Sequence, residues 1–382
     1  MAFRQAIFWS HLVVGVGVGL FVFIMSLTGV LLTYEHKIIH WVEDFQSVDI
    51  DDSRNRLSVD KLASIAIEKS SRAKLMLLGV DRREDAPVTV YLLGETRLDI
   101  HPYSGELLDS QAATVEFIMH AIVSIHRSLA TGRNGLGHTL MAASNLVLLF
   151  LIVSGLYLWF PRVLKWPFLK MNLVFAKRYP TAKARDFNWH HVFGFWCLVP
   201  LFLVVLTGVI ISYPWANRIL YDAYGETAPA QEGPPFLSGA SLQGETASLP
   251  EGKQLASLQS AFNAAKGHDD TWTSIRLLMP VQTQAPQVRL LVNTGNGILP
   301  EQRTTLVYDR VQETIASVQR YEDMTNAQQA RMFVRFLHTG EQFGFIGSTI
   351  AGLASLAACF LVYTGIALSY RRLVQPYFRR RT

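Results

Sequence analysis

His11-Leu-Val-Val-Gly15, followed by Leu27-Thr28-Gly29-Val30, recurs later in the chain as His190-His-Val-Phe-Gly194, followed by Leu206-Thr207-Gly208-Val209. In each copy the histidine stands 17 residues before the threonine, and no Asp, Glu, Lys or Arg lies between them. We interpret the two stretches as copies of one membrane helix, each with a histidine near one end. The sequence therefore predicts an internal duplication.

Four segments of the 382 residues are long and apolar enough to cross a bilayer, whose hydrocarbon core takes about 20 residues of helix. None contains Asp, Glu, Lys or Arg, and a charge at the centre of a span costs roughly 2.5–3.5 kcal/mol to insert. We therefore expect an integral membrane α-helical protein with a four-TM bundle, whose apolar segments are Leu12–Leu32, Thr139–Phe160, Val192–Tyr213 and Phe343–Tyr370.

The charges flanking the spans predict the orientation. The segment 161–188 holds seven Lys or Arg residues against one acid, Asp186, and the tail 371–382 holds five arginines. Basic loops stay in the cytoplasm, so both termini are expected there, and the net charge of +5 requires no nucleic-acid partner. The predicted order is TM1 (7–35), outer domain 1 (37–125), TM2 (138–160), the basic loop (161–188), TM3 (189–214), outer domain 2 (216–337), TM4 (343–370) and the basic tail (371–382).

Each outer segment has a helical apolar pattern followed by short alternating runs that indicate strands. The helical patterns are Leu57–Ser71 and Gln254–Ala265, and the strands are Leu75–Val80, Val88–Leu93, Arg97–His101, Ser274–Leu278, Gln287–Val292 and Thr304–Tyr308. We expect two small α+β domains.

The segment Asp99-Ile-His-Pro-Tyr-Ser-Gly-Glu-Leu-Leu108 places a turn between two strands. It resembles the hairpin of PepSY domains, and Val307-Tyr308-Asp309 begins a degraded second copy. With the H-x-x-x-G and T-G motifs of the spans, the whole chain resembles the PepSY-associated transmembrane helix family. The resemblance, closest to a ferrisiderophore reductase, implies an iron-regulated bacterial inner-membrane protein with PepSY-like domains in the periplasm.

Paired histidines on facing membrane helices can hold a b-type haem iron from both sides. We predict that His11 and His190, the inner pair, do so near the cytoplasmic face. Gly15 and Gly194, one turn after each histidine, would leave flat space for a porphyrin. Gly15 has an alternative reading as part of a helix-packing patch. His191 points about 100° away from His190 and is an alternative ligand.

A second pair, the outer pair, consists of His126 and His338. Each precedes a glycine-rich connection and then a span that carries Ser154-Gly155 or Thr364-Gly365. The family resemblance implies that His126 and His338 are haem ligands near the outer face. His138, which opens the second span, competes with His126 for this role.

Other cofactors have no motif in the sequence. The chain lacks C-x-x-C-H for covalent haem, and its two cysteines, Cys197 and Cys359, lie within spans. Gly15-Val-Gly17-Val-Gly19 imitates a dinucleotide loop but lies inside a span, so no flavin or NAD site is expected. We expect two bis-histidine haem b groups, held by coordination and packing in a lipid bilayer.

These features predict an oxidoreductase that carries electrons across the membrane from an unknown cytoplasmic or quinol donor. The family resemblance implies that the acceptor is a ferric siderophore in the periplasm, for which we hypothesise a hydroxamate of the ferrioxamine type. Two other functions are open: a non-enzymatic PepSY sensor or assembly protein, and a cytochrome b subunit that needs a separate catalytic chain.

Overall fold

A computed structural model describes residues 2–50, 55–69, 75–92, 97–161, 165–229, 254–280 and 285–379. They form two compact units. The helical unit contains Met1–Glu35, Met119–Glu226 and Ala330–Thr382, and the sheet unit contains His36–Ile118 and Thr227–Gln329.

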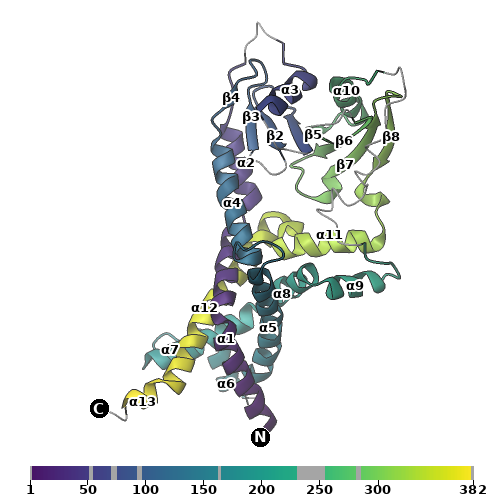
Figure 1. Ribbon diagram of the computed structural model, residues 1–382. Helices are drawn as coiled ribbons and strands as arrows, with labels where there is room; N and C mark the ends of the chain where they lie inside the picture. The colour runs from purple at the N-terminus through teal and green to yellow at the C-terminus, as the bar shows by residue number, and fades with distance from the viewer. Residues whose placement is uncertain are drawn as a thin grey trace. The chain divides into compact units, whose positions relative to one another are not determined.

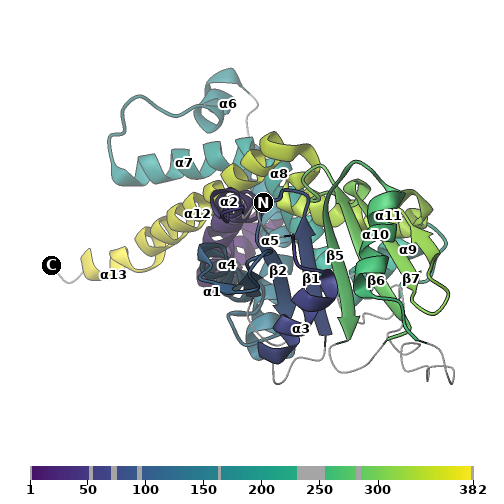
Figure 2. The ribbon, with the colours of Figure 1, turned by 90° about the horizontal axis from the view of Figure 1, so that it is seen from above.

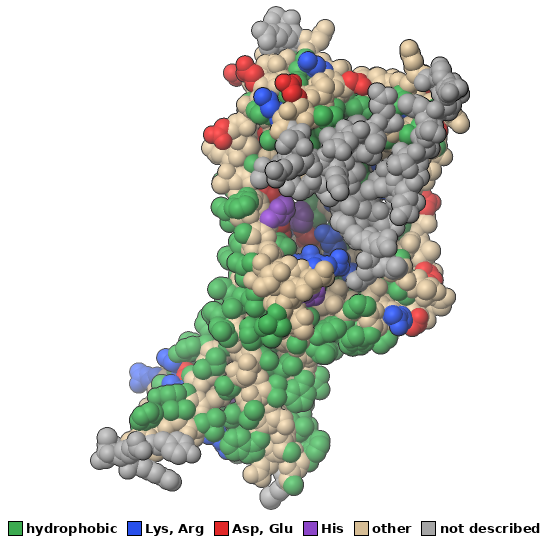
Figure 3. Space-filling view, viewed as in Figure 1, with side chains coloured by type: hydrophobic (Ala, Val, Ile, Leu, Met, Phe, Trp, Pro, Cys, Tyr) green, Lys and Arg blue, Asp and Glu red, His purple; other side chains and the backbone are tan. Residues whose placement is uncertain are grey.

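Three helices of the helical unit are long and apolar enough to cross a membrane: α1 (Ala2–Leu32), α5 (Leu136–Trp159) and α12 (Gly344–Leu373). Both α5 and α12 lie alongside α1 (Figure 1). Hydrophobic side chains cover much of their outer surface (Figure 3). Inside, Val22, Leu148, Ile152 and Ala358 are among the residues that form a buried core.

The third expected span is bent. Helices α7 (Ala182–Trp196) and α8 (Leu198–Ser212) meet at Cys197 with an angle of 68°, so the described residues contain three spans, or four if this pair is one. Pro200 explains the break, because proline has no N–H to bond the carbonyl of Trp196 and its ring collides with that carbonyl. In the first half the matching position is Phe21, and α1 runs through without interruption.

Shorter helices lie in the helical unit or lead from it into the sheet unit. They are α2 (Glu35–Phe45), α4 (Gln111–Ser128), α6 (Trp166–Leu173), α9 (Pro214–Asp222), α11 (Asn326–Thr339) and α13 (Gln375–Arg379). Helices α4 and α11 end at Ser128 and Thr339, so each brings a predicted histidine, His126 or His338, into the helical unit.

The sheet unit contains one antiparallel sheet of eight strands in the order β4-β3-β2-β1-β5-β6-β7-β8. The strands are β1 (Leu75–Asp81), β2 (Val88–Leu92), β3 (Arg97–Ile100), β4 (Leu107–Leu108), β5 (Trp272–Pro280), β6 (Gln287–Thr294), β7 (Arg303–Asp309) and β8 (Thr314–Gln319). Strands β1 and β5 pair along their length, from Leu75 opposite Pro280 to Asp81 opposite Ser274. The two segments that we expected as separate α+β domains therefore share one sheet.

Helices α3 (Val59–Lys69) and α10 (Leu258–His268) cover one face of this sheet (Figure 2). Leu62, Met76, Leu78, Ile275 and Leu277 are among the residues buried between helices and strands. The two helices also cap each other across the two halves. The Asp60 carboxylate accepts hydrogen bonds from the backbone N–H groups of Leu258 and Gln259, at 2.8 and 2.9 Å, and the Gln259 side chain accepts one from the N–H of Val59.

The segment expected to form a hairpin turns between β3 and β4. His101 Nδ1 accepts hydrogen bonds from the N–H groups of Tyr103 and Ser104, both at 3.2 Å. Gly105 closes the turn with a φ of +77°, and a Cβ there would lie 2.7 Å from Ile65. His101 thus organises the turn, and the glycine is required by both conformation and space.

Candidate functional site

The inner histidines each contact a hydroxyl on a neighbouring span. His11 in α1 lies with its Nδ1 2.8 Å from the Ser154 hydroxyl in α5. His190 in α7 lies with its Nδ1 2.9 Å from the Thr364 hydroxyl in α12. Both hydroxyl residues directly precede the glycines that the sequence repeat singled out, so the two halves build the same contact.

The outer histidines repeat this arrangement on the other two Thr-Gly pairs. His126 in α4 lies with its Nδ1 2.9 Å from the Thr28 hydroxyl in α1. His338 in α11 lies with its Nδ1 3.1 Å from the Thr207 hydroxyl in α8, and 2.8 Å from the carbonyl oxygen of Val204. All four predicted histidines are therefore held in one way, by contacts within their own half of the chain.

The hydrogen-bond pattern fixes which ring nitrogen of each histidine carries a proton. Each of the four hydroxyls donates its only proton to the carbonyl four residues earlier in its helix, at 2.7 Å in every case. The hydroxyl must then accept from the imidazole, so Nδ1 carries the proton. For His338 the second contact leads to the same result, because a carbonyl can only accept. The lone pair is left on Nε2, the nitrogen available to a metal.

The glycine after each hydroxyl residue gives the imidazole its space. A Cβ built on Gly155, Gly365, Gly29 or Gly208 would lie 3.3, 3.5, 3.6 or 3.2 Å from the Cε1 atom of the histidine in contact. The Ser/Thr-Gly pair thus works as a unit, in which the hydroxyl orients the ring and the glycine lets it approach the helix.

Two other glycines have a different environment from the one we expected. A Cβ on Gly15 would meet Leu151, and a Cβ on Gly194 would meet Leu361, both at 3.7 Å. These glycines face neighbouring helices, as in the alternative reading of Gly15 as a helix-packing residue. The role of Gly29, Gly155, Gly208 and Gly365 was not predicted from the sequence, although their recurrence after Ser or Thr was a visible signal.

The histidines of each pair lie close enough to affect each other electrostatically. The charged form of His126 is repelled by His338, and that of His190 by its neighbour His191 and less strongly by His11. Burial lowers the pKa of His126 to about 4, with a smaller contribution from His338, so the imidazole is neutral at neutral pH. Along α1, His11 and the Thr28 that contacts His126 are separated by about 26 Å. The inner and outer pairs therefore lie towards opposite ends of the bundle.

The alternative histidines lack this arrangement. His191 Nδ1 donates to the carbonyl of Phe187 in its own helix, at 2.9 Å, and its ring packs on the Phe187 ring at 4.1 Å. His138 lies at the start of α5, where its backbone N–H bonds to the carbonyl of Gly135.

Each of the four histidines leaves one ring nitrogen available to a metal or to a haem iron. Neutral imidazoles with a free Nε2 are the axial ligands that haem iron takes. Among the described residues, no group of three or more His, Cys, Asp and Glu side chains is placed to hold a metal ion.

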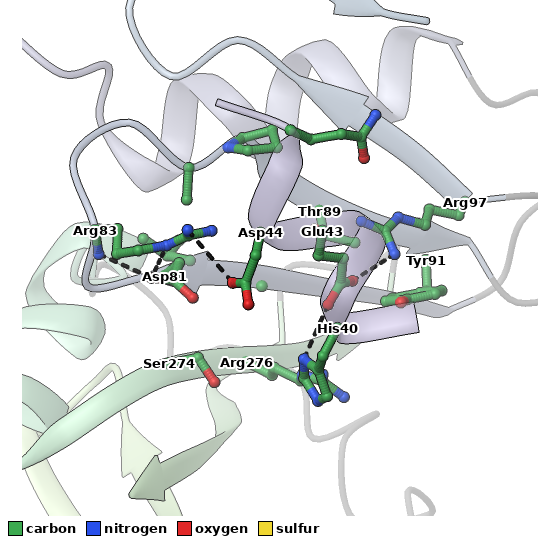
Figure 4. Close-up of a pocket in the computed structure, with 15 residues that line it drawn as sticks. His40, Glu43, Asp44, Asp81, Arg83, Thr89, Tyr91, Arg97, Ser274 and Arg276 are labelled. Carbon is green, nitrogen blue, oxygen red and sulfur yellow. Dashed lines mark hydrogen bonds and ion pairs between the residues drawn. The ribbon is translucent and has the colours of Figure 1, made fainter. Parts of the chain in front are cut away.

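A polar pocket in the sheet unit has a cavity of about 100 Å³ between α2 and the strands β1, β2 and β5 (Figure 4). Glu43 accepts a hydrogen bond from Arg97 at 2.6 Å and lies 3.1 Å from His40 Nδ1. Arg97 also pairs with buried Asp99 at 2.8 Å and with Glu116 at 3.4 Å. These ion pairs tie α2 and α4 to β3.

A family model described as the PepSY-associated TM region matches residues 8–372. The comparison with curated proteins gives no match.

Proposed function

Because this chain belongs to the family of the PepSY-associated TM region, we propose that His11 and His190 are the axial ligands of one haem b and His126 and His338 those of a second. The protein is then a di-haem oxidoreductase of the bacterial inner membrane. Its termini lie in the cytoplasm and its PepSY-like part in the periplasm.

The observation that carries this proposal is the fourfold repeat of one contact, in which a Ser or Thr hydroxyl holds a histidine Nδ1 and leaves Nε2 free. A histidine that only packs has no need of a fixed tautomer, whereas an axial ligand does. The neutral imidazole of His126 and the position of the two pairs towards opposite ends of the bundle support an electron path across the bilayer.

Haem supplies reversible one-electron chemistry when both axial positions are filled. The chain's own contribution is to hold each imidazole at a set angle, to exclude water with apolar helices, and to separate the two pairs along the membrane normal. Electrons would enter from a cytoplasmic or quinol donor and leave beside the outer pair.

The acceptor that we propose is a ferric siderophore in the periplasm, with a ferrioxamine-type hydroxamate as one candidate. Each Fe(III) chelate takes up one electron and becomes Fe(II), which hard oxygen ligands bind more weakly. A two-electron quinol would thus serve two chelates and release two protons at its own side. No covalent step at the protein is needed.

The test is to purify the full chain and measure its haem content and its reaction. We expect a Soret band, about two haems b per chain, and oxidation of the pre-reduced protein by a ferric siderophore. A colourless protein would refute the proposal and favour the sensor or assembly role. Haem without reaction towards ferric chelates would favour a cytochrome b subunit with a separate catalytic chain.

A further inference from the structure

Four arginines gather around the outer histidines in the helical unit. Arg331 and Arg335 precede His338 by seven and three residues in α11, which places all three on one helix face. Arg127 directly follows His126 in α4, and Arg133 lies in the connection between α4 and α5. The guanidinium of Arg335 lies over the Phe336 ring, 5.4 Å from its centroid, which keeps it close to the helix. We call these four residues the arginine rim.

The arginine rim carries four positive charges. None of the four side chains forms an ion pair or a side-chain hydrogen bond with another residue that the structure describes. Arg127 is repelled by Arg133 and Arg335, and Arg331 by Arg335. Arg331 is half-buried and lies near Tyr221, whose ionised form would attract it, whereas Arg127, Arg133 and Arg335 are exposed. By contrast, the buried Arg97 is paired with Asp99.

Unpaired arginines held together against their mutual repulsion are stabilised by an anion with several oxygens. We propose that the arginine rim binds the electron acceptor and selects ferric chelates of net negative charge, whose carboxylate or other anionic oxygens pair with the guanidinium groups. The assignment rests on the proposed function for its acceptor, but binding to the rim can be measured without electron transfer.

This proposal narrows the substrate class. A ferrioxamine that carries a free ammonium group is a cation and is repelled by the rim, whereas a polycarboxylate chelate is attracted. Haem propionates are a second source of carboxylates and would neutralise part of the same charge. The test therefore has to distinguish binding of a chelate to the rim from pairing of the rim with haem propionates.

The experiment uses gallium(III)–EDTA, a redox-inert anionic analogue of a ferric chelate, and the full haem-loaded protein in detergent. Calorimetry should show binding that weakens when ionic strength rises from about 0.1 to about 1 M, since the screening length falls from about 10 to about 3 Å. Arg331→Gln and Arg335→Gln should each weaken binding about tenfold, which corresponds to about 1.4 kcal/mol. Their haem content should stay at the wild-type level.

The matched control is Arg218→Gln, which removes an exposed arginine from α9 in the same unit and should bind gallium(III)–EDTA like the wild type. Three results overturn the assignment. The first is that a cationic gallium ferrioxamine binds with the same affinity as gallium(III)–EDTA. The second is that both rim variants bind gallium(III)–EDTA as the wild type does. The third is that the rim variants lose the outer haem, which would mean that the rim pairs with haem propionates. A protein without haem that still binds gallium(III)–EDTA through the rim would refute the proposed function while supporting the rim.

Discussion

Each of the four predicted histidines presents Nδ1 to a Ser or Thr hydroxyl, so the hydroxyl residues belong to the candidate site as much as the histidines do. The sequence predicted His11 and His190 from their matched spacing and His126 and His338 from the family resemblance, and it showed the Ser-Gly and Thr-Gly pairs. It did not show that a pair on one helix serves a histidine on another, because a one-dimensional repeat does not state which helices are neighbours.

Removing one hydroxyl tests this contact. Thr28→Val has the same shape but cannot accept from His126 Nδ1, so the outer haem should be held 10- to 100-fold more weakly, the usual range for the partner of a metal ligand. Haem titration of the apoprotein measures this change. Thr28→Ser keeps the hydroxyl and should behave as the wild type; equal affinity in the valine variant would contradict the role given to Thr28.

The glycines allow a second test. In Gly208→Ala the new Cβ would lie 2.9 Å from Asn145 Nδ2 and 3.2 Å from His338 Cε1, so neighbouring groups must move. We expect a loss of about 1–3 kcal/mol of stability and a disturbed outer haem spectrum. Gly17→Ala is the control, because nothing lies within 4 Å of its Cβ position. Similar spectra and melting temperatures for the two variants would show that Gly208 is not required for close approach.

Among the elements, most helices and strands were predicted close to their positions because their apolar periodicity is local. The strand predicted at Gln287–Val292 is β6 (Gln287–Thr294), and the helix predicted from Leu57 is α3 (Val59–Lys69). The bend of the third span was not predicted, although Pro200 was visible. The duplication suggested a straight helix like α1, and proline is tolerated within a span when its neighbours compensate.

The bend gives a prediction for the inner pair. Pro200→Ala restores the missing backbone donor and should favour a straighter path through Trp196 and Leu198. His190 would then turn away from Thr364, so the inner haem should lose more occupancy than the outer one, whose His338 is held by Thr207 beyond the bend. Spectra of the two haems, resolved by redox titration, check this. A change in the outer haem only would contradict the account, and Pro214→Ala, at the start of α9, serves as control.

The ion pairs of the sheet unit make a prediction about stability. Arg97→Ala leaves Asp99 buried without its cation, which costs about 3–5 kcal/mol, and releases Glu43 and Glu116. Thermal unfolding should occur at a lower temperature. Arg83→Ala removes only looser pairs near the surface, at 3.5 and 3.6 Å, and should cost less than about 1 kcal/mol. Equal melting temperatures for the two variants would exclude this role of Arg97.

For the whole molecule, the sequence indicated two copies, and the element order of the second half follows that of the first. What the sequence did not show is how the copies join. Strands β1 and β5 are almost 200 residues apart in the sequence. They can pair only because each is the edge strand of the four strands that its half of the chain contributes. Local patterns carry no information about such a contact, so two separate domains were expected where one sheet formed.

The same duplication predicts how histidine variants combine. If each haem takes one ligand from each half, His11→Ala and His190→Ala should each leave one haem, and the double variant should also leave one. Combining His11→Ala with His126→Ala should leave none. Measuring the haem content per protein in all four variants tests the pairing. One remaining haem in the variant that combines His11→Ala with His126→Ala would mean that the histidines are not paired as proposed.

The hydroxyls that hold the imidazoles have a consequence for the coupling of electrons to protons. Each hydroxyl has already given its hydrogen to a helix carbonyl, so no ligand can pass on its Nδ1 proton when the charge of the iron changes. We therefore expect both midpoint potentials to stay constant between about pH 6 and 8, without the slope of about 59 mV per pH unit of a one-proton couple. The protein would then transfer electrons without protons, and any protons would be taken up or released by the electron donor and the acceptor.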